Sequence, residues 1–266
     1  MNWGAISLTQ AACRILETAL PAGKASLSAA TAAAWRRSDI SEIGVSAPPE
    51  RPARPDQPVL QHPSKMPRRR GAAGRIALIH AIAHIELNAI DLAWDMIARF
   101  ANPDLPRDFY DDWVRVGEEE AKHFTLLNAR LGTLGAAYGD LPAHDGLWQS
   151  AQETAHDPLA RLAVAPLVLE ARGLDVTPAM IERLDRAGDT QSADILRIIL
   201  AEEIGHVAAG RRWFGYIAQE RGLDPASTFQ ALVSKHYRGA IKPPFNKADR
   251  EAAGFETDWY EPLTTT

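Results

Sequence analysis

Four long stretches of the chain repeat apolar residues at intervals of three, four and seven, which is the spacing of a helix with one buried face. No stretch alternates apolar and polar positions as a strand would, and the turn chemistry of hairpins is missing. Asn102-Pro103-Asp104 and Gly188-Asp189 mark turns between stretches. We therefore predict an all-α fold with long helices over residues 71–101, 106–131, 157–173 and 190–221.

Shorter helices and irregular segments are predicted around these four helices. The short helices cover residues 7–20, 24–37, 143–155, 178–187 and 225–236. Prolines crowd residues 47–70, which predicts an extended segment, and Pro166 should kink the third long helix. Aromatic residues in the tail indicate that it packs on the body: Phe245, Phe255, Trp259 and Tyr260. The predicted regions are N-terminal helices with a Pro-rich segment (1–70), a four-helix bundle (71–237) and a tail (238–266).

One carboxylate interrupts the apolar face of each long helix, and two of these helices add a histidine three residues further on. These residues are Glu86, Glu120, His123, Glu170, Glu203 and His206. Burial of a carboxylate costs several kcal/mol unless a cation or a proton accompanies it. The same faces contain no Lys or Arg, so the sequence predicts that these six residues bind metal ions.

The spacing of the six residues indicates a two-fold symmetric site for two metal ions. A Glu followed by Glu-x-x-His occurs twice with nearly equal separations, and the i, i+3 spacing places each Glu and His on one helix face. Glu86 lies about 15 residues before the turn at Asn102 and Glu120 about 15 after it, so an antiparallel pair brings both to one level. Cys13 is the only cysteine, which leaves nitrogen and oxygen ligands and favours iron, manganese or zinc.

This ligand set is the one described for ferritin-like di-iron and di-manganese carboxylate proteins. The sequence also resembles a bacterial family of uncharacterised ferritin-like proteins through the stretches HAIAHIELNAIDLAWD, EEEAKHF, LEARGLD and AEEIGHV. The resemblance spans most of the chain after residue 70. It implies a ferritin-like antiparallel four-helix bundle, here with extra N- and C-terminal helices and an irregular Pro-rich segment, and it brings no assigned reaction.

Several other polar residues have two interpretations. In better-understood di-iron oxygenases, an acidic residue before the motif Glu supports a ligand histidine, and Glu119 and Glu202 occupy those positions. Both residues could equally face solvent. His80 and His84 lie off the ligand face, so helix packing or surface roles are expected. Further residues could support the imidazoles or act as redox partners, with solvent exposure or packing as the alternative: Asp91, Asp95, Asp194, Tyr110, Tyr138 and Tyr216.

The predicted cofactors are two iron ions, with manganese or a mixed pair as alternatives. Such a site suggests an oxygen-dependent oxidase or hydroxylase whose substrate is a small molecule or a modified nucleotide. The additions at both ends could wall a substrate pocket, and electrons would come from a separate reductase. The resemblance equally covers ferroxidases that handle iron, and a non-catalytic metal-binding protein is a further alternative.

Charge and hydropathy limit the expected partners. The net charge of −5 and the isoelectric point near 5.9 give no overall attraction to nucleic acid, and the run Arg68, Arg69 and Arg70 is interpreted as a solvated loop. We find no charged leader and no run of about 18 apolar residues, the length that a membrane span requires. The expected location is the cytoplasm, without a membrane partner.

Overall fold

The computed structural model describes residues 3–66 and 71–264. Helices dominate these ranges, and no strand occurs within them beyond two isolated bridges, Leu60 with Ala143 and Ile241 with Thr264. The all-α prediction is therefore confirmed. The basic run Arg68, Arg69 and Arg70 lies outside the described residues.

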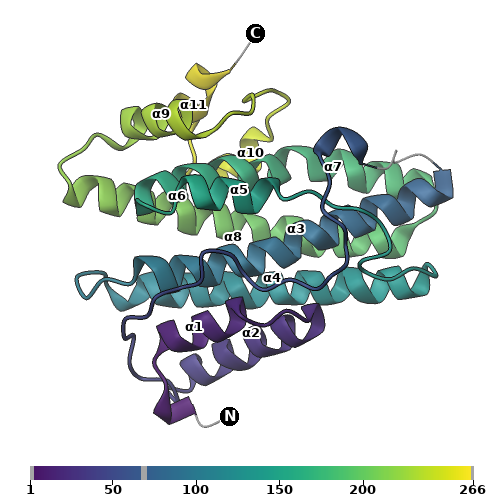
Figure 1. Ribbon diagram of the computed structural model, residues 1–266. Coiled ribbons are helices and arrows are strands. Elements are labelled where there is room, and N and C mark those ends of the chain that lie inside the picture. The colour runs from purple at the N-terminus through teal and green to yellow at the C-terminus, as the bar shows by residue number, and fades with distance from the viewer. Residues whose placement is uncertain (1–2, 67–70, 265–266) are drawn as a thin grey trace. The chain divides into compact units, whose positions relative to one another are not determined.

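The chain forms two compact units, Met1–Trp148 and Gln149–Thr266. The division predicted at residues 70 and 237 stays a prediction. In the first unit, α3 (Gly71–Phe100) and α4 (Arg107–Thr133) form an antiparallel pair, joined by a short turn (Figure 1). Tyr110 stabilises this turn because its hydroxyl donates to the carbonyl of Asn102 at 2.9 Å and accepts from the amide of Asn102 at 3.0 Å.

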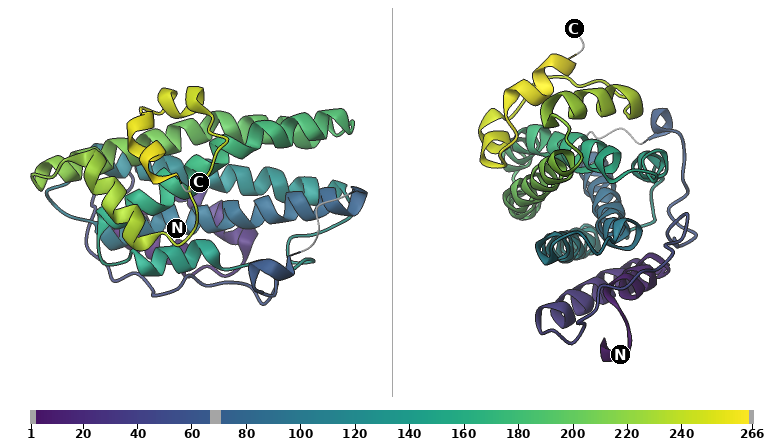
Figure 2. Two further views of the ribbon diagram at one scale, coloured as in Figure 1. Left: turned by 90° about the horizontal axis from the view of Figure 1, so that it is seen from above. Right: turned by 90° about the vertical axis from the view of Figure 1, so that its left-hand side faces the viewer.

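Two short helices lie side by side on one face of this pair (Figures 1 and 2). They are α1 (Leu8–Leu16), which contacts α3, and α2 (Pro21–Arg36), which contacts α4. Helix α1 begins with a capping box between Ser7 and Gln10. The Pro-rich stretch after α2 is irregular over its described residues 47–66 and contains the short turn η2 (Pro63–Lys65), whereas the short turn η1 (Trp3–Ala5) precedes α1. Helix α5 (Gly146–Glu153) contains the sequence boundary between the two units, after Trp148.

Residues Ala73–Phe100 of α3 are long and apolar enough to cross a membrane by length and composition. The expectation that no stretch would have this character was therefore wrong. However, 83% of the most apolar window is buried inside the protein. Core helices of soluble proteins pass the same test, because a helix enclosed by others is apolar on most of its surface.

The second unit is built on a long interrupted helix that packs against α8 (Thr190–Glu220). The interrupted helix consists of α6 (Pro158–Val164), the π-helical segment η3 (Ala165–Glu170) and α7 (Ala171–Arg186). Two predictions were wrong here, because Gly173 does not end the helix and residues 178–187 form no separate one. Pro178 lies inside α7 and has no N–H to donate to the carbonyl of Leu174, four residues earlier. That carbonyl instead accepts from the side-chain amide of Asn246 at 3.2 Å.

The remaining helices of this unit form a cap of aromatic side chains. They are α9 (Pro225–His236), α10 (Lys247–Ala252), α11 (Thr257–Tyr260) and the turn η4 (Glu261–Leu263). Phe255 meets Phe229 edge to face at 5.5 Å between ring centroids, and Trp259 meets Phe214 at 5.7 Å. The aromatic residues of the tail thus lie against α8 and α9 within this unit.

Candidate metal centre

The first unit brings Glu86 of α3 together with Glu120 and His123 of α4. Each side chain offers one ligand atom, and these atoms lie within 4.8 Å of one another. All three residues are buried. The Nδ1 atom of His123 lies 3.2 Å from Oε2 of Glu86 and 3.5 Å from Oε2 of Glu120. We call these residues the first triad.

The first triad has the charge of a site that needs a cation. Burial and then the negative charge of Glu120 hold the pKa of Glu86 well above its usual range. Burial opposes protonation of His123, but hydrogen bonds and charges from Glu120 and Glu86 outweigh it and raise the pKa of that imidazole well above its usual range. Protons therefore offset the carboxylate charge in the metal-free chain. A metal ion could replace them, since two carboxylates and an imidazole suit a hard or borderline divalent ion.

The second unit brings Glu170 together with Glu203 and His206 of α8, again with ligand atoms within 4.8 Å of one another. We call these residues the second triad. His206 and Glu203 are buried, whereas Glu170 is half-buried. The Nδ1 atom of His206 lies 3.6 Å from Oε2 of Glu203. The donor set is the same as in the first triad, so clusters of Glu and His that could hold metal occur in both units.

The π-helical segment places Glu170 at the end of a widened turn. The amide of Ala171 donates to the carbonyl of Pro166, five residues back. Gly210 of α8 packs directly on this turn, because a Cβ atom at Gly210 would lie 2.5 Å from Cβ of Pro166. Pro166 precedes Glu170 by four residues and Gly210 follows His206 by four, so this close contact sets the level of the two ligands relative to each other.

His80 and His84, expected off the ligand face, take part in packing around Tyr138. His84 Nδ1 lies 2.7 Å from the hydroxyl of Tyr138, and its Nε2 lies 3.1 Å from the carbonyl of His144. His80 accepts from the amide of Gly139 at 3.0 Å and stacks on the Tyr138 ring. Both imidazoles thus have structural roles in the first unit.

The residues considered as supports for the imidazoles have cationic partners. Asp91 pairs with Lys24 and Arg54, Asp95 with Arg99 at 2.8 Å, and Asp194 with Arg197 at 2.6 Å. Glu119 accepts from Arg115 at 3.0 Å, and Glu202 is half-buried. A role for Glu119 and Glu202 behind the ligand histidines stays a prediction.

Sequence analysis missed the buried cations that lie outside the long apolar faces. Lys24 on α2 and Arg250 on α10 are almost fully buried, and each pairs with a buried aspartate. One sequence signal could have pointed to these pairs. An aspartate follows each of two ligand Glu residues by five positions, Asp91 after Glu86 and Asp175 after Glu170.

The fold and the two triads define an all-helical protein with buried carboxylate and histidine clusters able to hold metal. The chain belongs to the family described as "Protein of unknown function (DUF455)", whose family model matches residues 17–261 and so includes both triads. It is similar to an uncharacterized protein of Haemophilus influenzae, with 45% identity over 215 residues, covering 77% of this chain and 75% of that protein. No solved structure matches the chain.

Proposed function

We propose that the two triads together form one dinuclear metal centre in a ferritin-like antiparallel four-helix bundle. The observation that carries this proposal is the repetition in both units of one Glu combined with a buried Glu-x-x-His pair. The two Glu residues of a triad are 34 positions apart in the first unit and 33 in the second. Duplicated ligand sets of this kind bind two metal ions between four helices. Two of the helices each provide one Glu, and the other two each provide a Glu-x-x-His motif.

Iron is the metal that this donor set favours, with manganese or a mixed pair as alternatives. Four carboxylates and two imidazoles are hard or borderline ligands that stabilise oxidised first-row metals, and the single cysteine, Cys13, excludes a thiolate-rich site. Two such ions, once bound, supply redox chemistry with oxygen. Six protein ligands leave coordination positions for water, oxygen or substrate.

The proposed activity is therefore the oxygen-dependent oxidation or hydroxylation of a small molecule or a modified nucleotide, with a separate reductase as electron donor. The residues of the triads would hold the metals, and the five that are buried would exclude bulk water. His123 would give up its proton when metal binds, because the imidazole nitrogen must be neutral to act as a ligand. Metal uptake should consequently release protons and weaken in acid.

An iron-handling ferroxidase is the second candidate, because the half-buried Glu170 leaves one triad closer to solvent than the other. Iron that is oxidised and passed on needs such an exit, whereas an oxidase retains its two ions. The two functions differ in what happens to iron beyond two equivalents.

Anaerobic iron loading followed by mixing with oxygen tests these proposals. Two iron ions should bind per chain, and the optical spectrum should change within seconds to minutes of mixing. Stoichiometry well below two would contradict the dinuclear centre, and a ferrous form stable in air would contradict the oxidase. Turnover of excess iron would favour the ferroxidase. His84→Ala is the matched control, since His84 lies on the ligand-bearing helix α3 but binds Tyr138 and His144.

A further inference from the structure

The two Glu ligands that stand alone on their helices share a feature beyond the triads. Five residues after each of them lies a buried aspartate, Asp91 after Glu86 and Asp175 after Glu170. Five residues rotate a helix by about 140°, so each aspartate projects from the side of the helix away from its ligand Glu. Each is paired there with a buried cation from a segment outside the long helices.

In the first unit, the cations come from the N-terminal part of the chain. Lys24 of α2 donates to Oδ1 of Asp91, and Arg54 of the Pro-rich segment lies 2.8 Å from Oδ2. Lys24 also donates to the carbonyl of Ala53 at 3.3 Å, and Arg54 donates to Asn88 of α3 at 2.7 Å. The side chains of Lys24 and Asp91 are 1% and 0% exposed, so this pair is shielded from solvent screening.

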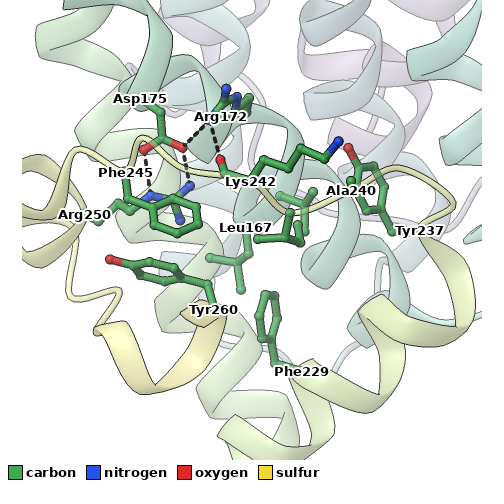
Figure 3. Close-up of a pocket in the computed structure, with 12 residues that line it drawn as sticks. Leu167, Arg172, Asp175, Phe229, Tyr237, Ala240, Lys242, Phe245, Arg250 and Tyr260 are labelled. Carbon is green, nitrogen blue, oxygen red and sulfur yellow. Dashed lines mark hydrogen bonds and ion pairs between the residues drawn. The ribbon is translucent and has the colours of Figure 1, made fainter. Parts of the chain in front are cut away.

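In the second unit, the cation comes from the C-terminal tail. Arg250 binds Asp175 through two bonds, of 2.9 Å from Nε and 2.7 Å from Nη2 (Figure 3). Its guanidinium lies 4.3 Å from the centroid of the Tyr260 ring, and Nη2 also donates to the carbonyl of Ala171 at 3.3 Å. Ala171 directly follows Glu170, so Arg250 contacts the backbone beside the ligand as well as the aspartate one turn later.

The tail makes further bonds to the same turn of α7. Arg172 donates to the carbonyl of Lys242 at 2.8 Å (Figure 3). It also donates to the carbonyl of Pro244 at 3.1 Å. Asn246 donates through its backbone amide to Asp175 at 2.9 Å and through its side chain to Leu174 at 3.2 Å. The turn after Glu170 is therefore fixed by backbone and side-chain groups from 70 to 79 residues away in sequence. A helix interrupted by two prolines has lost internal hydrogen bonds. The contacts from the tail hold this turn in place where those hydrogen bonds are missing.

We propose that Asp91 and Asp175 are equivalent positioning residues, through which the N-terminal and C-terminal extensions hold Glu86 and Glu170 at their metals. The proposal rests on the metal centre proposed above. It assigns one function to two segments that are unrelated in sequence and structure. Its central consequence is selectivity: the Arg250–Asp175 pair governs metal affinity at the second triad, and the Lys24–Asp91 pair governs it at the first.

The test is an anaerobic cobalt titration, read by absorbance, in which one triad at a time is removed. Arg250→Gln is made in chains carrying His123→Ala, which leaves the second triad, and in chains carrying His206→Ala, which leaves the first. Cobalt affinity should fall about tenfold or more in the His123→Ala background, as for supports behind other metal ligands, and stay unchanged in the other. Lys24→Gln should give the opposite pattern. Arg250→Lys, which keeps the charge, should recover part of the loss.

Two control variants remove ion pairs of the extensions that do not involve Asp91 or Asp175. Lys247→Gln breaks the exposed pair with Glu261, and Arg36→Gln breaks the exposed pair with Glu118. Both should leave cobalt affinity unchanged. If Arg250→Gln fails to fold, Asn246→Ser keeps the N-cap of α10 but loses the bond to Leu174, and it should weaken the second triad only.

Equal losses in both backgrounds, or no loss in either, would overturn the positioning role. An unchanged affinity of the second triad in Asn246→Ser, should Arg250→Gln not fold, would overturn it as well. A wild-type chain that takes up no cobalt would instead contradict the metal centre itself. The two failures are therefore distinguishable.

Discussion

Glu86 and Glu170 hold corresponding places in the two triads, but the helices that carry them differ. Helix α3 runs for 30 residues without a proline, and Glu86 is buried on it. Glu170 ends a π-helical segment that contains Pro166, is followed by a helix that contains Pro178, and is half-buried. The first triad thus stands on regular helices, while the second depends on contacts from distant segments. Equal ligand sets need not be equally rigid, and the second triad should be the more easily disturbed.

Removal of a ligand histidine should have the largest effect. His123→Ala and His206→Ala each eliminate a metal-binding nitrogen from one triad, so bound iron should fall from two ions per chain to one or fewer. Metal analysis after anaerobic loading measures this. His84→Ala should retain two ions, and its failure to do so would show that the ligands have been assigned to the wrong helix face. Loss of both ions from either histidine variant would show that the triads bind interdependently.

Loss of a buried cation should come next. Arg250→Met leaves the carboxylate of Asp175 buried with the backbone amide of Asn246 as a donor and with Arg172, at 3.5 Å, as its remaining cationic partner, and should cost about 3–5 kcal/mol of unfolding free energy in the metal-free protein. Lys24→Met should cost less, because Arg54 still pairs with Asp91. Urea denaturation measures both values. Addition of Asp91→Leu to Lys24→Met should recover stability, and a further loss would contradict the ion-pair explanation.

Acid should weaken the first unit through His84. Burial, with a lesser contribution from the charge of Arg54, lowers the pKa of His84 to about 4, although the hydrogen bond to the His144 carbonyl opposes this shift; the unfolded value is 6.5. The unfolded chain therefore binds a proton that the folded chain refuses, and this contribution to stability declines as the pH falls from about 6.5 to 4. The full effect is on the order of 3 kcal/mol.

The protonation of Glu86 acts in the opposite direction in the metal-free chain, because its folded pKa is raised. The informative quantity is hence the difference between wild type and His84→Gln, from urea denaturation at pH 7 and pH 5. The variant should lose less stability on acidification than the wild type. An identical pH dependence would exclude His84 as the responsible group.

Substitution of single helical glycines by alanine should give the smallest effects. These variants allow the packing within one unit to be compared with the packing within the other. A Cβ at Gly210 would lie 2.5 Å from Pro166, and one at Gly117 would lie 2.7 Å from the indole nitrogen of Trp94. Gly210→Ala and Gly117→Ala should each cost about 1–3 kcal/mol by overpacking. Gly132→Ala in α4 has open space and should be neutral or slightly stabilising. We expect Gly210→Ala also to lower iron affinity, since it displaces the turn before Glu170.

Three of the four long helices and the membership of each triad could be predicted from sequence, because both follow from the 3.6-residue period within single elements. Glu120 with His123, and Glu203 with His206, are fixed by one helix each, and they lie together as expected. Pro166 predicts a kink, but the structure has a π-helical segment there. The sequence around a proline does not show which backbone amides will donate to the carbonyl groups near it. Lys24 and Arg250 escaped notice because their partners lie 67 and 75 residues away. Periodicity describes one helix at a time and carries no information about such pairs.

The π-helical segment has a consequence for how this family should be aligned. A turn closed by an i+5 bond contains one residue more than an α-helical turn, so residues after Glu170 are rotated by about 100° relative to a continuous α-helix. If the interrupted helix α6–η3–α7 is aligned with α3 by its pattern of apolar residues, a one-residue gap is therefore needed within residues 165–170. Relatives that lack this extra residue would present a different side chain at the position of Glu170, and a count of shared ligands made without the gap would miss true members.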